Sequence, residues 1–345
     1  MTRKINVGGV AIGGGAPVTV QSMCSTKTED AGATAAQINR LAAAGCDIVR
    51  VAVPDMAAAK AIAEIKKKIK IPLVADIHFD YRLALAAVDA GADKIRINPG
   101  NVGGRENVRA VATACAAAGV PIRIGVNGGS LEKRLLEKYG APTPEALCES
   151  ATEQAAMLEE FGFRDICVSV KSSNVATTVA AYRRMAATTD YPLHLGVTEA
   201  GTEFAGTVNS AVGIGALLLD GIGDTVRVSL TAEPEREVAA GIAVLKAAGR
   251  RTGGVRFVSC PTCGRTQIDL ISLAKEVEAR LAGVQRDVTV AVMGCAVNGP
   301  GEAREADFGV AGGKGEGLLF MKGQIVRKVP YEAIADELMK LIEEN

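Results

Sequence analysis

Short apolar runs alternate with longer amphipathic segments along most of the chain. From Val18 onward, a β-branched run of six or seven residues is followed by a polar connection and then by an Ala-rich helical pattern that ends at glycine. A glycine in this place is typical of the left-handed residue that ends a helix. Five such glycines stand shortly before a later run: Gly45, Gly91, Gly119, Gly162 and Gly221. The alternation predicts parallel α/β structure.

Eight of these apolar runs are predicted to be strands. They are residues 18–23, 47–53, 72–77, 94–99, 121–126, 165–171, 192–197 and 225–230. The helices predicted between them include residues 33–44, 56–68, 82–90, 144–161 and 235–248. Eight βα units over about 230 residues match a closed (β/α)8 TIM barrel. A doubly wound open sheet would place a Gly-rich dinucleotide loop after the first strand, whereas the glycine run 13–15 precedes that strand.

The pattern changes after Gly249, where the sequence RRTGG at residues 250–254 is typical of a short flexible linker. We therefore assign residues 1–249 to the barrel domain, which starts with a hairpin around Gly8 and Gly9. Residues 255–345 are expected to form a small α+β domain. Its predicted elements are a strand that ends at Cys260, a helix at 266–281, strands at 288–293, 308–311, 317–322 and 324–329, and a final helix from Tyr331.

The composition narrows the class of protein. Thirty-nine basic residues balance 39 acidic residues, so the overall charge does not indicate nucleic acid or an anionic membrane as a partner. The eight cysteines are scattered through 345 residues, unlike a small secreted disulfide scaffold. The N-terminal stretch is broken by glycines, and no apolar run reaches membrane-spanning length. We therefore expect a cytoplasmic protein.

Five cations stand beside β-branched residues on the predicted barrel strands. They are Arg50, Arg96, Arg123, Lys171 and Arg227. If the β-branched neighbours pack on the helices, strand alternation directs the five cations into the barrel. The carboxylates placed near strand ends are Asp76 and Glu199, so about three positive charges stay without a partner, which is costly in a buried place. The pattern predicts a multiply charged anion such as a diphosphate at the barrel mouth.

Other polar residues near the strand ends enlarge this predicted site: His78, Asn98, Asn127 and Ser229, together with Gln21, Ser22, Ser172, Asn174 and Thr198. Of the two histidines, His78 follows Asp76 closely, while His194 lies early in its strand and is expected to be structural. Cys24, directly after the first strand, is placed to reach the mouth. The cysteines at 46, 115, 148 and 167 are expected to be small core residues.

Two cysteine motifs mark the second domain. The first is SCPTCG, residues 259–264, and the second is GCAVNGPGE, residues 294–302. The thiols of Cys260, Cys263 and Cys295 can converge on one metal centre, while their prolines and glycines leave backbone amides free to point at sulfur. A structural zinc site would normally show a fourth Cys or His, which residues 255–345 lack.

Glu302 is the nearest anionic candidate for a fourth ligand of that centre. A carboxylate binds iron more weakly than a thiolate does, so such a site has one exchangeable position and is suited to chemistry. Iron–sulfur is the preferred interpretation. Zinc with a borrowed cysteine and a redox disulfide between Cys260 and Cys263 stay open as alternatives.

Nine motifs in this order closely resemble the 4-hydroxy-3-methylbut-2-enyl diphosphate synthase family of the methylerythritol phosphate route to isoprenoids, in its bacterial two-domain form. They are QSMCSTKTED, VRVAVP, LVADIHFD, KIRINPGN, PIRIGVNGGS, SVKSSN, LGVTEAG, SCPTCGRT and GCAVNGPGEA. The resemblance implies an iron–sulfur oxidoreductase that reductively opens 2-C-methyl-D-erythritol 2,4-cyclodiphosphate and releases water. It also implies a [4Fe–4S] cluster, with ferredoxin or flavodoxin as electron donor.

The same resemblance assigns residue roles. The cluster ligands would be Cys260, Cys263, Cys295 and Glu302. The cyclic diphosphate would be held by Arg50, Arg96, Arg123, Lys171 and Arg227, with Asp76, His78, Asn98, Asn127 and Ser229 in its pocket and Glu199 as proton donor. Two other classes stay open: an electron-transfer protein whose barrel is only a scaffold, and a zinc-dependent hydrolytic barrel enzyme.

The linker also bears on assembly. In a (β/α)8 barrel the last helix runs back toward the face opposite the mouth. A helix of fourteen residues is roughly 21 Å long, whereas a linker of five residues spans at most about 18 Å. Folding the small domain over its own mouth would be strained. We therefore expect a head-to-tail homodimer in which each cluster domain covers the partner's barrel, as the resemblance also implies.

Overall fold

The computed structural model describes residues 1–98, 100–284, 286–295 and 304–345. The chain forms two compact units, Met1–Arg251 and Thr252–Asn345. None of the helices in the described ranges combines the length and the apolar character that a membrane span needs.

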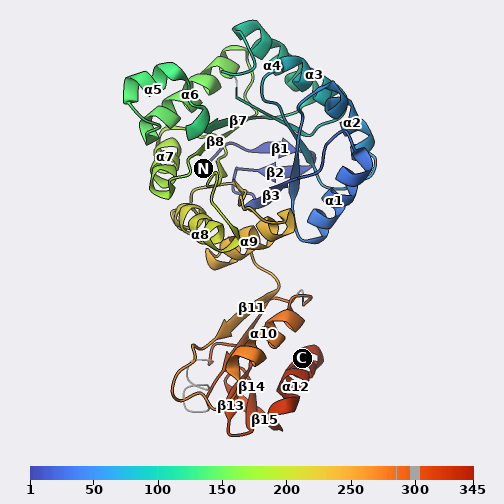
Figure 1. The fold of residues 1–345 in the computed structure, drawn as a ribbon, viewed down its shortest axis with the longest axis vertical. Coiled ribbons are helices and arrows are strands. Elements are labelled where there is room, and N and C mark those ends of the chain that lie inside the picture. Colours follow the sequence, from blue (N-terminus) through green and yellow to red (C-terminus); the bar gives the residue numbers. More distant parts are fainter. Residues whose placement is uncertain (99, 285, 296–303) are drawn as a thin grey trace. The chain divides into compact units, whose positions relative to one another are not determined.

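The first unit is a ring of eight parallel strands (Figure 1). The strands are β3 (Thr19–Met23), β4 (Ile48–Ala52), β5 (Leu73–Asp76), β6 (Lys94–Ile97), β7 (Ile122–Asn127), β8 (Ile166–Lys171), β9 (His194–Leu195) and β10 (Thr225–Val226). Their order is β8-β7-β6-β5-β4-β3-β10-β9, and a parallel bridge between Val168 of β8 and Leu193, just before β9, closes the ring. Each strand lies within its predicted range or ends one residue beyond it, and the predicted TIM barrel is confirmed.

Helices surround the strands on the outside of the ring (Figure 1). They are α1 (Ala31–Ala43), α2 (Met56–Lys66), α3 (Tyr81–Asp89), α4 (Arg105–Ala118), α6 (Pro144–Glu160), α7 (Val175–Thr188), α8 (Glu203–Leu219) and α9 (Pro234–Ala247). Side chains of Asp30, Asp55, Asp80 and Thr143 accept hydrogen bonds from the first turns of α1, α2, α3 and α6. A short additional helix, α5 (Lys133–Tyr139), lies between β7 and α6.

A hairpin of β1 (Ile5–Val7) and β2 (Val10–Ile12) precedes the barrel. Its turn uses Gly8 and Gly9, both at positive φ, and a Cβ on Gly8 would lie 2.7 Å from the Asp93 carboxylate. The hairpin packs Ile5, Val7 and Ile12 against a set of side chains near the amino ends of the barrel strands: Ile48, Val74 and Cys167. The hairpin therefore plugs the amino-terminal end of the barrel.

In its described residues, the second unit consists of one five-stranded sheet and two long helices. Its strands are β11 (Val255–Ser259), β12 (Val288–Met293), β13 (Phe308–Gly313), β14 (Glu316–Met321) and β15 (Gln324–Pro330), in that order across the sheet. β11, β12 and β13 are parallel, whereas β13, β14 and β15 are antiparallel. The helices α10 (Leu270–Leu281) and α12 (Ile334–Glu344) share one apolar core with the sheet. The predicted small α+β fold is confirmed.

The predicted start of the first helix in this unit is wrong. The helix predicted from residue 266 begins at Leu270, because Asp269 caps it by accepting a hydrogen bond from the Ser272 amide at 3.1 Å. The preceding residues bind elsewhere. The Gln267 amide donates to the Gly294 carbonyl at 3.0 Å, which ties the first cysteine motif to the second.

Candidate active site

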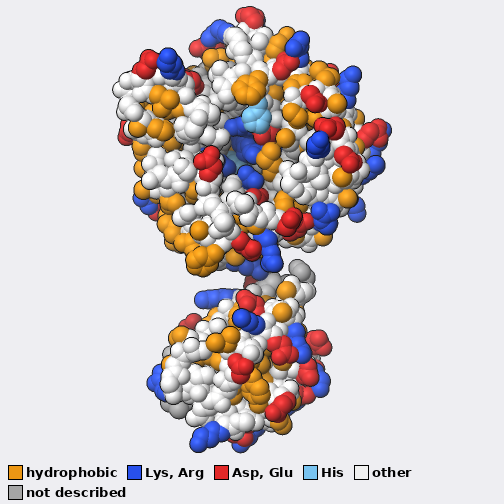
Figure 2. All heavy atoms as spheres, viewed as in Figure 1, with side chains coloured by type: hydrophobic (Ala, Val, Ile, Leu, Met, Phe, Trp, Pro, Cys, Tyr) orange, Lys and Arg blue, Asp and Glu red, His pale blue; other side chains and the backbone are white. Residues whose placement is uncertain are grey.

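All five predicted cations line one cavity at the carboxyl ends of the barrel strands. The cavity has a volume of about 110 Å³ and is bounded by Arg50, Asp76, His78, Arg96, Arg123, Asn127, Ser169, Lys171, Thr198, Arg227 and Ser229. Figure 2 shows the basic side chains at the base of the hollow in the barrel unit. Ten of the eleven lining residues, all except Ser169, are predicted site residues, and they lie on or shortly after seven of the eight strands.

Asp76 holds two of the guanidiniums. Its side chain is nearly fully buried, and it accepts a hydrogen bond from Arg96 Nη1 at 3.1 Å, while Arg50 Nε lies 3.7 Å away. Burial alone would raise the pKa of Asp76, but Arg50 and Arg96 outweigh it and hold that pKa below its ordinary value. His78 Nε2 lies 3.8 Å from the same carboxylate, with half of its side chain exposed at the rim.

Arg227 has a partner that the sequence analysis missed. Its Nη2 donates to both oxygens of Glu237, at 3.1 and 3.2 Å. Glu237 belongs to α9 and is buried, and it also accepts from the Leu230 amide at 2.9 Å and from Ser22 Oγ at 3.3 Å. The expected carboxylate, Glu199, is not paired with any of the five cations in the described part of the chain. Its place is taken by a helix residue, for which strand alternation gives no signal.

Arg123 and Lys171 have no carboxylate partner among the described residues. Arg123 is 1% exposed, and its Nε and Nη1 have no hydrogen-bond partner there. Burial lowers the pKa of Lys171 well below its ordinary value, and the neighbouring guanidiniums lower it further. Two carboxylates, Asp76 and Glu237, thus face five cations. The cavity keeps the surplus of about three positive charges that the sequence predicted.

Two glycines make room for these cations. A Cβ on Gly125 would lie 2.4 Å from Arg96 Nε, and a Cβ on Gly196 would lie 2.6 Å from Lys171 Nζ. The Gly125 carbonyl also accepts a hydrogen bond from Arg96 Nη2 at 3.1 Å. Neither glycine was predicted to belong to the site. The sequence does contain a sign of this role. Gly125 lies two residues from both Arg123 and Asn127, so on a strand it belongs to the same inward-facing set as these polar residues.

A second cavity shares Asn127 and Thr198 with the first. Its volume is about 440 Å³, and its further lining residues are Gly128, Gly129, Ser130, Pro142, Ser172, Ser173 and Glu199. Glu199 has a positive φ of 52°, which is uncommon for a residue with a side chain and often occurs at functional sites. Glu199 therefore lies at the edge of the site rather than among the cations.

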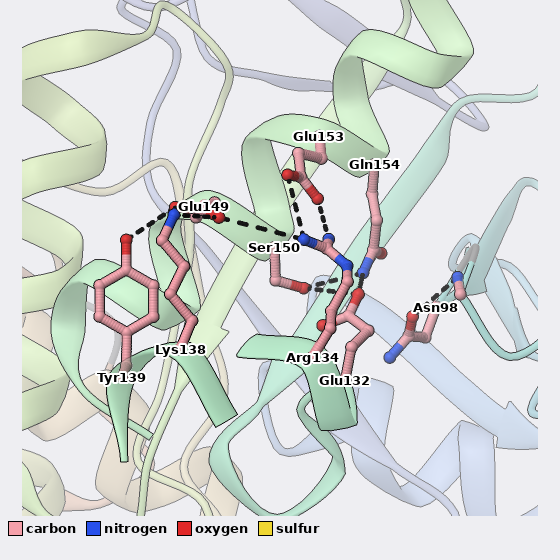
Figure 3. Close-up of polar contacts among 10 residues, drawn as sticks. Asn98, Glu132, Arg134, Lys138, Tyr139, Glu149, Ser150, Glu153 and Gln154 are labelled. Carbon is pink, nitrogen blue, oxygen red and sulfur yellow. Dashed lines mark hydrogen bonds and ion pairs between the residues drawn. The ribbon is translucent and has the colours of Figure 1, made fainter. Parts of the chain in front are cut away.

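Asn98 makes a hydrogen bond within its own loop (Figure 3). Its Oδ1 accepts a hydrogen bond from the Gly100 amide at 3.1 Å, and Asn98 lines neither cavity in the described residues. Nearby, Glu132 Oε1 accepts from Ser150 Oγ at 2.9 Å and from Gln154 Nε2 at 2.8 Å. These bonds fasten the segment after β7 to α6. In the structure, the Asn98 side chain therefore stabilises its own loop through the bond from the Gly100 amide.

The remaining barrel candidates are internal. His194 is fully buried, and Cys24 is 8% exposed within the main apolar core. Burial raises the pKa of the Cys24 thiol to about 12. Cys24 does not line the cation cavity among the described residues, so its expected approach to the mouth is wrong. Asn174 caps α7 through the Thr177 amide at 2.9 Å instead of facing either cavity.

The cysteine motifs of the second unit meet at the carboxyl ends of two neighbouring strands. Cys260 follows β11 and Cys295 follows β12 after Gly294, and Ser259 pairs in register with Val292. The Gly294 amide donates to Cys260 Sγ at 3.1 Å. Hydrogen bonds from Arg265, chiefly from its backbone amide, lower the pKa of the exposed Cys263 thiol.

The described residues alone do not complete a metal site. No three of their His, Cys, Asp or Glu side chains are gathered closely enough to hold an ion. Glu302 lies outside the described residues. The four predicted cluster ligands therefore stay a prediction.

Comparison with known proteins decides the family. A family model described as the GcpE TIM-barrel domain matches residues 2–242, and one described as the GcpE protein C-terminal domain matches residues 256–344. The chain belongs to the GcpE family. The sequence-based resemblance is thereby confirmed.

Curated GcpE relatives are similar over nearly the whole chain. A protein of Geobacter sulfurreducens is 61% identical over 99% of this chain and 97% of its own length. One of Clostridium perfringens is 60% identical over 99% of this chain and 98% of its own length. Both are named 4-hydroxy-3-methylbut-2-en-1-yl diphosphate synthase (flavodoxin).

A solved dihydropteroate synthase of Yersinia pestis shares the barrel fold of this GcpE chain, with a TM-score of 0.52. It is 10% identical, and the match covers 73% of this chain and all of that one. At this identity the likeness shows the fold alone.

We predict that Gly125→Ala weakens the binding of inorganic pyrophosphate about tenfold or more. The new methyl group would displace the Arg96 guanidinium, and charged hydrogen bonds are worth roughly 1.5–3 kcal/mol each. Titration calorimetry measures the affinity. Gly104→Ala is the matched control, because nothing lies within 4 Å of the position of its Cβ. Equal affinity for the Gly125→Ala variant and the wild type would contradict this role.

Proposed function

We propose that this chain is the oxidoreductase that opens 2-C-methyl-D-erythritol 2,4-cyclodiphosphate and reduces it to 4-hydroxy-3-methylbut-2-enyl diphosphate with loss of water. The observation that carries the proposal is the cavity whose cations outnumber its carboxylates. A bound diphosphate would supply the missing negative charge. The names of the relatives support flavodoxin as the electron donor.

In this proposal the barrel residues bind and orient the substrate. Arg123 and Lys171 are free to meet the phosphate oxygens, because they have no carboxylate partner in the described structure. Arg50, Arg96 and Arg227 are held in place by Asp76 and Glu237, so little side-chain freedom is lost when they bind. Asn127 lines both cavities. It therefore lies where the diphosphate and the carbon skeleton would meet.

Proton transfer is assigned to the edge of the site. The reaction releases water, so a hydroxyl oxygen of the substrate must gain a proton. Glu199 lines the second cavity next to Thr198, which lines both, and we assign it as the proton donor. His78 lies at the rim, 3.8 Å from Asp76. In this proposal His78 orients the substrate, and Asp76 holds the His78 imidazole in position.

The cysteine region fits an iron–sulfur cluster. Backbone amides point at sulfur, as in the bond from Gly294 to Cys260 Sγ, and the lowered pKa of Cys263 favours the thiolate that iron binds. Cys260, Cys263, Cys295 and Glu302 would hold a [4Fe–4S] cluster, which would supply electrons to the substrate when bound. Three cysteines and one carboxylate would leave one weakly held position.

We predict that Cys263→Ala removes most of the bound iron and acid-labile sulfide from protein prepared without oxygen. Removing one of three thiolates leaves the cluster underligated. Metal and sulfide analysis measures the loss. Cys24→Ala, a buried cysteine of the barrel core, is the control that should keep both. Zinc without sulfide in the wild-type protein would instead favour the hydrolytic alternative.

We predict that Arg123→Ala weakens binding of the cyclic diphosphate about ten- to hundredfold, because one charged group that faces the phosphates is lost. The visible spectrum of the cluster should stay unchanged, since Arg123 belongs to the barrel unit. Equilibrium binding and absorption spectra check the two parts. Wild-type affinity in this variant would remove Arg123 from the substrate site, and failure of the wild type to convert the substrate would refute the proposed function.

We also propose a head-to-tail homodimer. The barrel unit ends near its amino-terminal end, where Arg251 Nη1 donates to Asp47 just before β4 at 3.1 Å. The cavity lies at the opposite end of the strands. The surface of α8 offers a place for a second copy, because Phe204 and Leu219 are largely exposed beside an apolar groove of about 530 Å³ between α8 and α9.

A mixture of two inactive chains tests the dimer. We predict that chains carrying Cys260→Ala regain activity when they are mixed with chains carrying Arg96→Ala, because one composite site in the mixed dimer would be intact. Each variant alone, remixed with itself, is the control. If each site is built within one chain, both chains keep their own defect and no activity returns.

A further inference from the structure

Lys94 lies one layer below the cation cavity. It precedes Arg96 by two residues on β6, so both side chains point into the barrel. Lys94 has no exposed surface, and it does not line the cavity. Its Nζ has no hydrogen-bond partner among the described residues. An ammonium group in such a place is costly unless something near it carries a negative charge.

His194, on whose pKa Lys94 acts, belongs to a layer of buried polar side chains that are unpaired in the described structure. Thr225 stands in register with Thr19 on one side and with His194 on the other. The side-chain polar atoms of these three residues and of Gln21 have no partner in the described structure, although all four residues are buried. Buried polar groups in proteins are nearly always satisfied by protein or by internal water. This layer therefore offers Lys94 no carboxylate and leaves its own hydrogen-bonding groups unsatisfied in the described structure.

The charges that face Lys94 are almost all positive. Arg123 and Arg50 are the cations that act on it most strongly, and the cavity above also holds Arg96, Lys171 and Arg227. Both buried carboxylates of this region are engaged, Asp76 by Arg96 and Glu237 by Arg227. The acidic group that acts most strongly on Lys94 is the thiol of Cys167, and burial raises the pKa of that thiol. His194 is buried, and its pKa lies well below its ordinary value for that reason.

Lysine can relieve this repulsion in a way that arginine cannot. A guanidinium keeps its proton in proteins, whereas a buried ammonium readily loses one. Burial lowers the pKa of Lys94 to about 8, and the nearby Arg123 and Arg50 also lower it. Of the six cations, only Lys94 and Lys171 can therefore become neutral near physiological pH. Lys171 touches the cavity, and Lys94 does not.

We propose that Lys94 loses its proton in the empty barrel at mildly alkaline pH and regains one when a polyanion fills the cavity above it. The proton comes from bulk water and becomes part of the ammonium. The negative charge of the ligand removes the repulsion that made the ammonium unfavourable. Lys94 thus acts through the field of the site, as a positioning residue, and this inference rests on the proposed anion site.

Anion binding should therefore be coupled to proton uptake in one pH range. Below about pH 7 Lys94 already carries its proton, so little uptake is expected there. At about pH 9 most of the free protein has lost it, and binding should draw in about 0.5–0.9 proton at Lys94. The sign follows from linkage: the protonated form binds the anion more tightly, so affinity falls as pH rises above about 8.

Titration calorimetry in two buffers of different ionisation enthalpy counts these protons. The anaerobic holoprotein is titrated without reductant, first with inorganic pyrophosphate and then with the cyclic diphosphate. We predict that Lys94→Met takes up about 0.5–0.9 proton fewer than the wild type at pH 9, and the same number at pH 6.5. Thr225→Val, a neutral change in the same layer, should leave the count unchanged.

The outcomes separate the two proposals. If pyrophosphate binds but the cyclic diphosphate does not, the proposed function fails while the proton count still tests Lys94. An unchanged count in Lys94→Met, or an equal loss in Thr225→Val, overturns the role of Lys94. Lys94→Met should also melt at a higher temperature than the wild type at pH 7, since it removes an unpaired buried charge. Should it fail to fold, a wild-type count of zero at pH 9 would still refute the inference.

Discussion

The structure depends on positive charge that the barrel interior cannot neutralise by itself. Two buried carboxylates, Asp76 and Glu237, face a group of cations that includes Arg123, which has no ion pair in the described structure. Most barrels fill this interior with branched apolar side chains. Here the folding free energy of the apolar shell between strands and helices must offset the cost of a charged centre. The charged centre is therefore a local cost to stability, which a bound anion of the proposed kind would reduce.

Backbone shape is as important to this centre as charge. Gly125 and Gly196 leave the volume that Arg96 and Lys171 occupy, so a single methyl group at either position would collide with a cation. Glu132 accepts hydrogen bonds from Ser150 and Gln154, and these bonds hold the segment after β7 against α6. The site is therefore preorganised by small residues and outer contacts as well as by the groups that would touch substrate.

Much of this molecule could be predicted from sequence, because its signals are local. The eightfold recurrence of strand and helix patterns predicted the barrel. The alternation along Ile95-Arg96-Ile97 predicted that the Arg96 guanidinium points into the barrel. Contacts between distant segments left no such signal. Glu237 reaches Arg227 from a helix, and the Gln267 amide, just before α10, donates to the carbonyl of the distant Gly294. The placement of Asn98 likewise depends on how its loop folds.

The hairpin of β1 and β2 gives the barrel only one open end. Ile5, Val7 and Ile12 seal the amino-terminal side against Ile48 and Val74. Water expelled by an arriving ligand must therefore leave by the route that the ligand takes, and a product must leave before the next molecule can enter. The barrel interior is closed at one end, so it is not a channel through the molecule. Ligand entry and product release must therefore follow one another through the same opening, and a group that covers the mouth would control both.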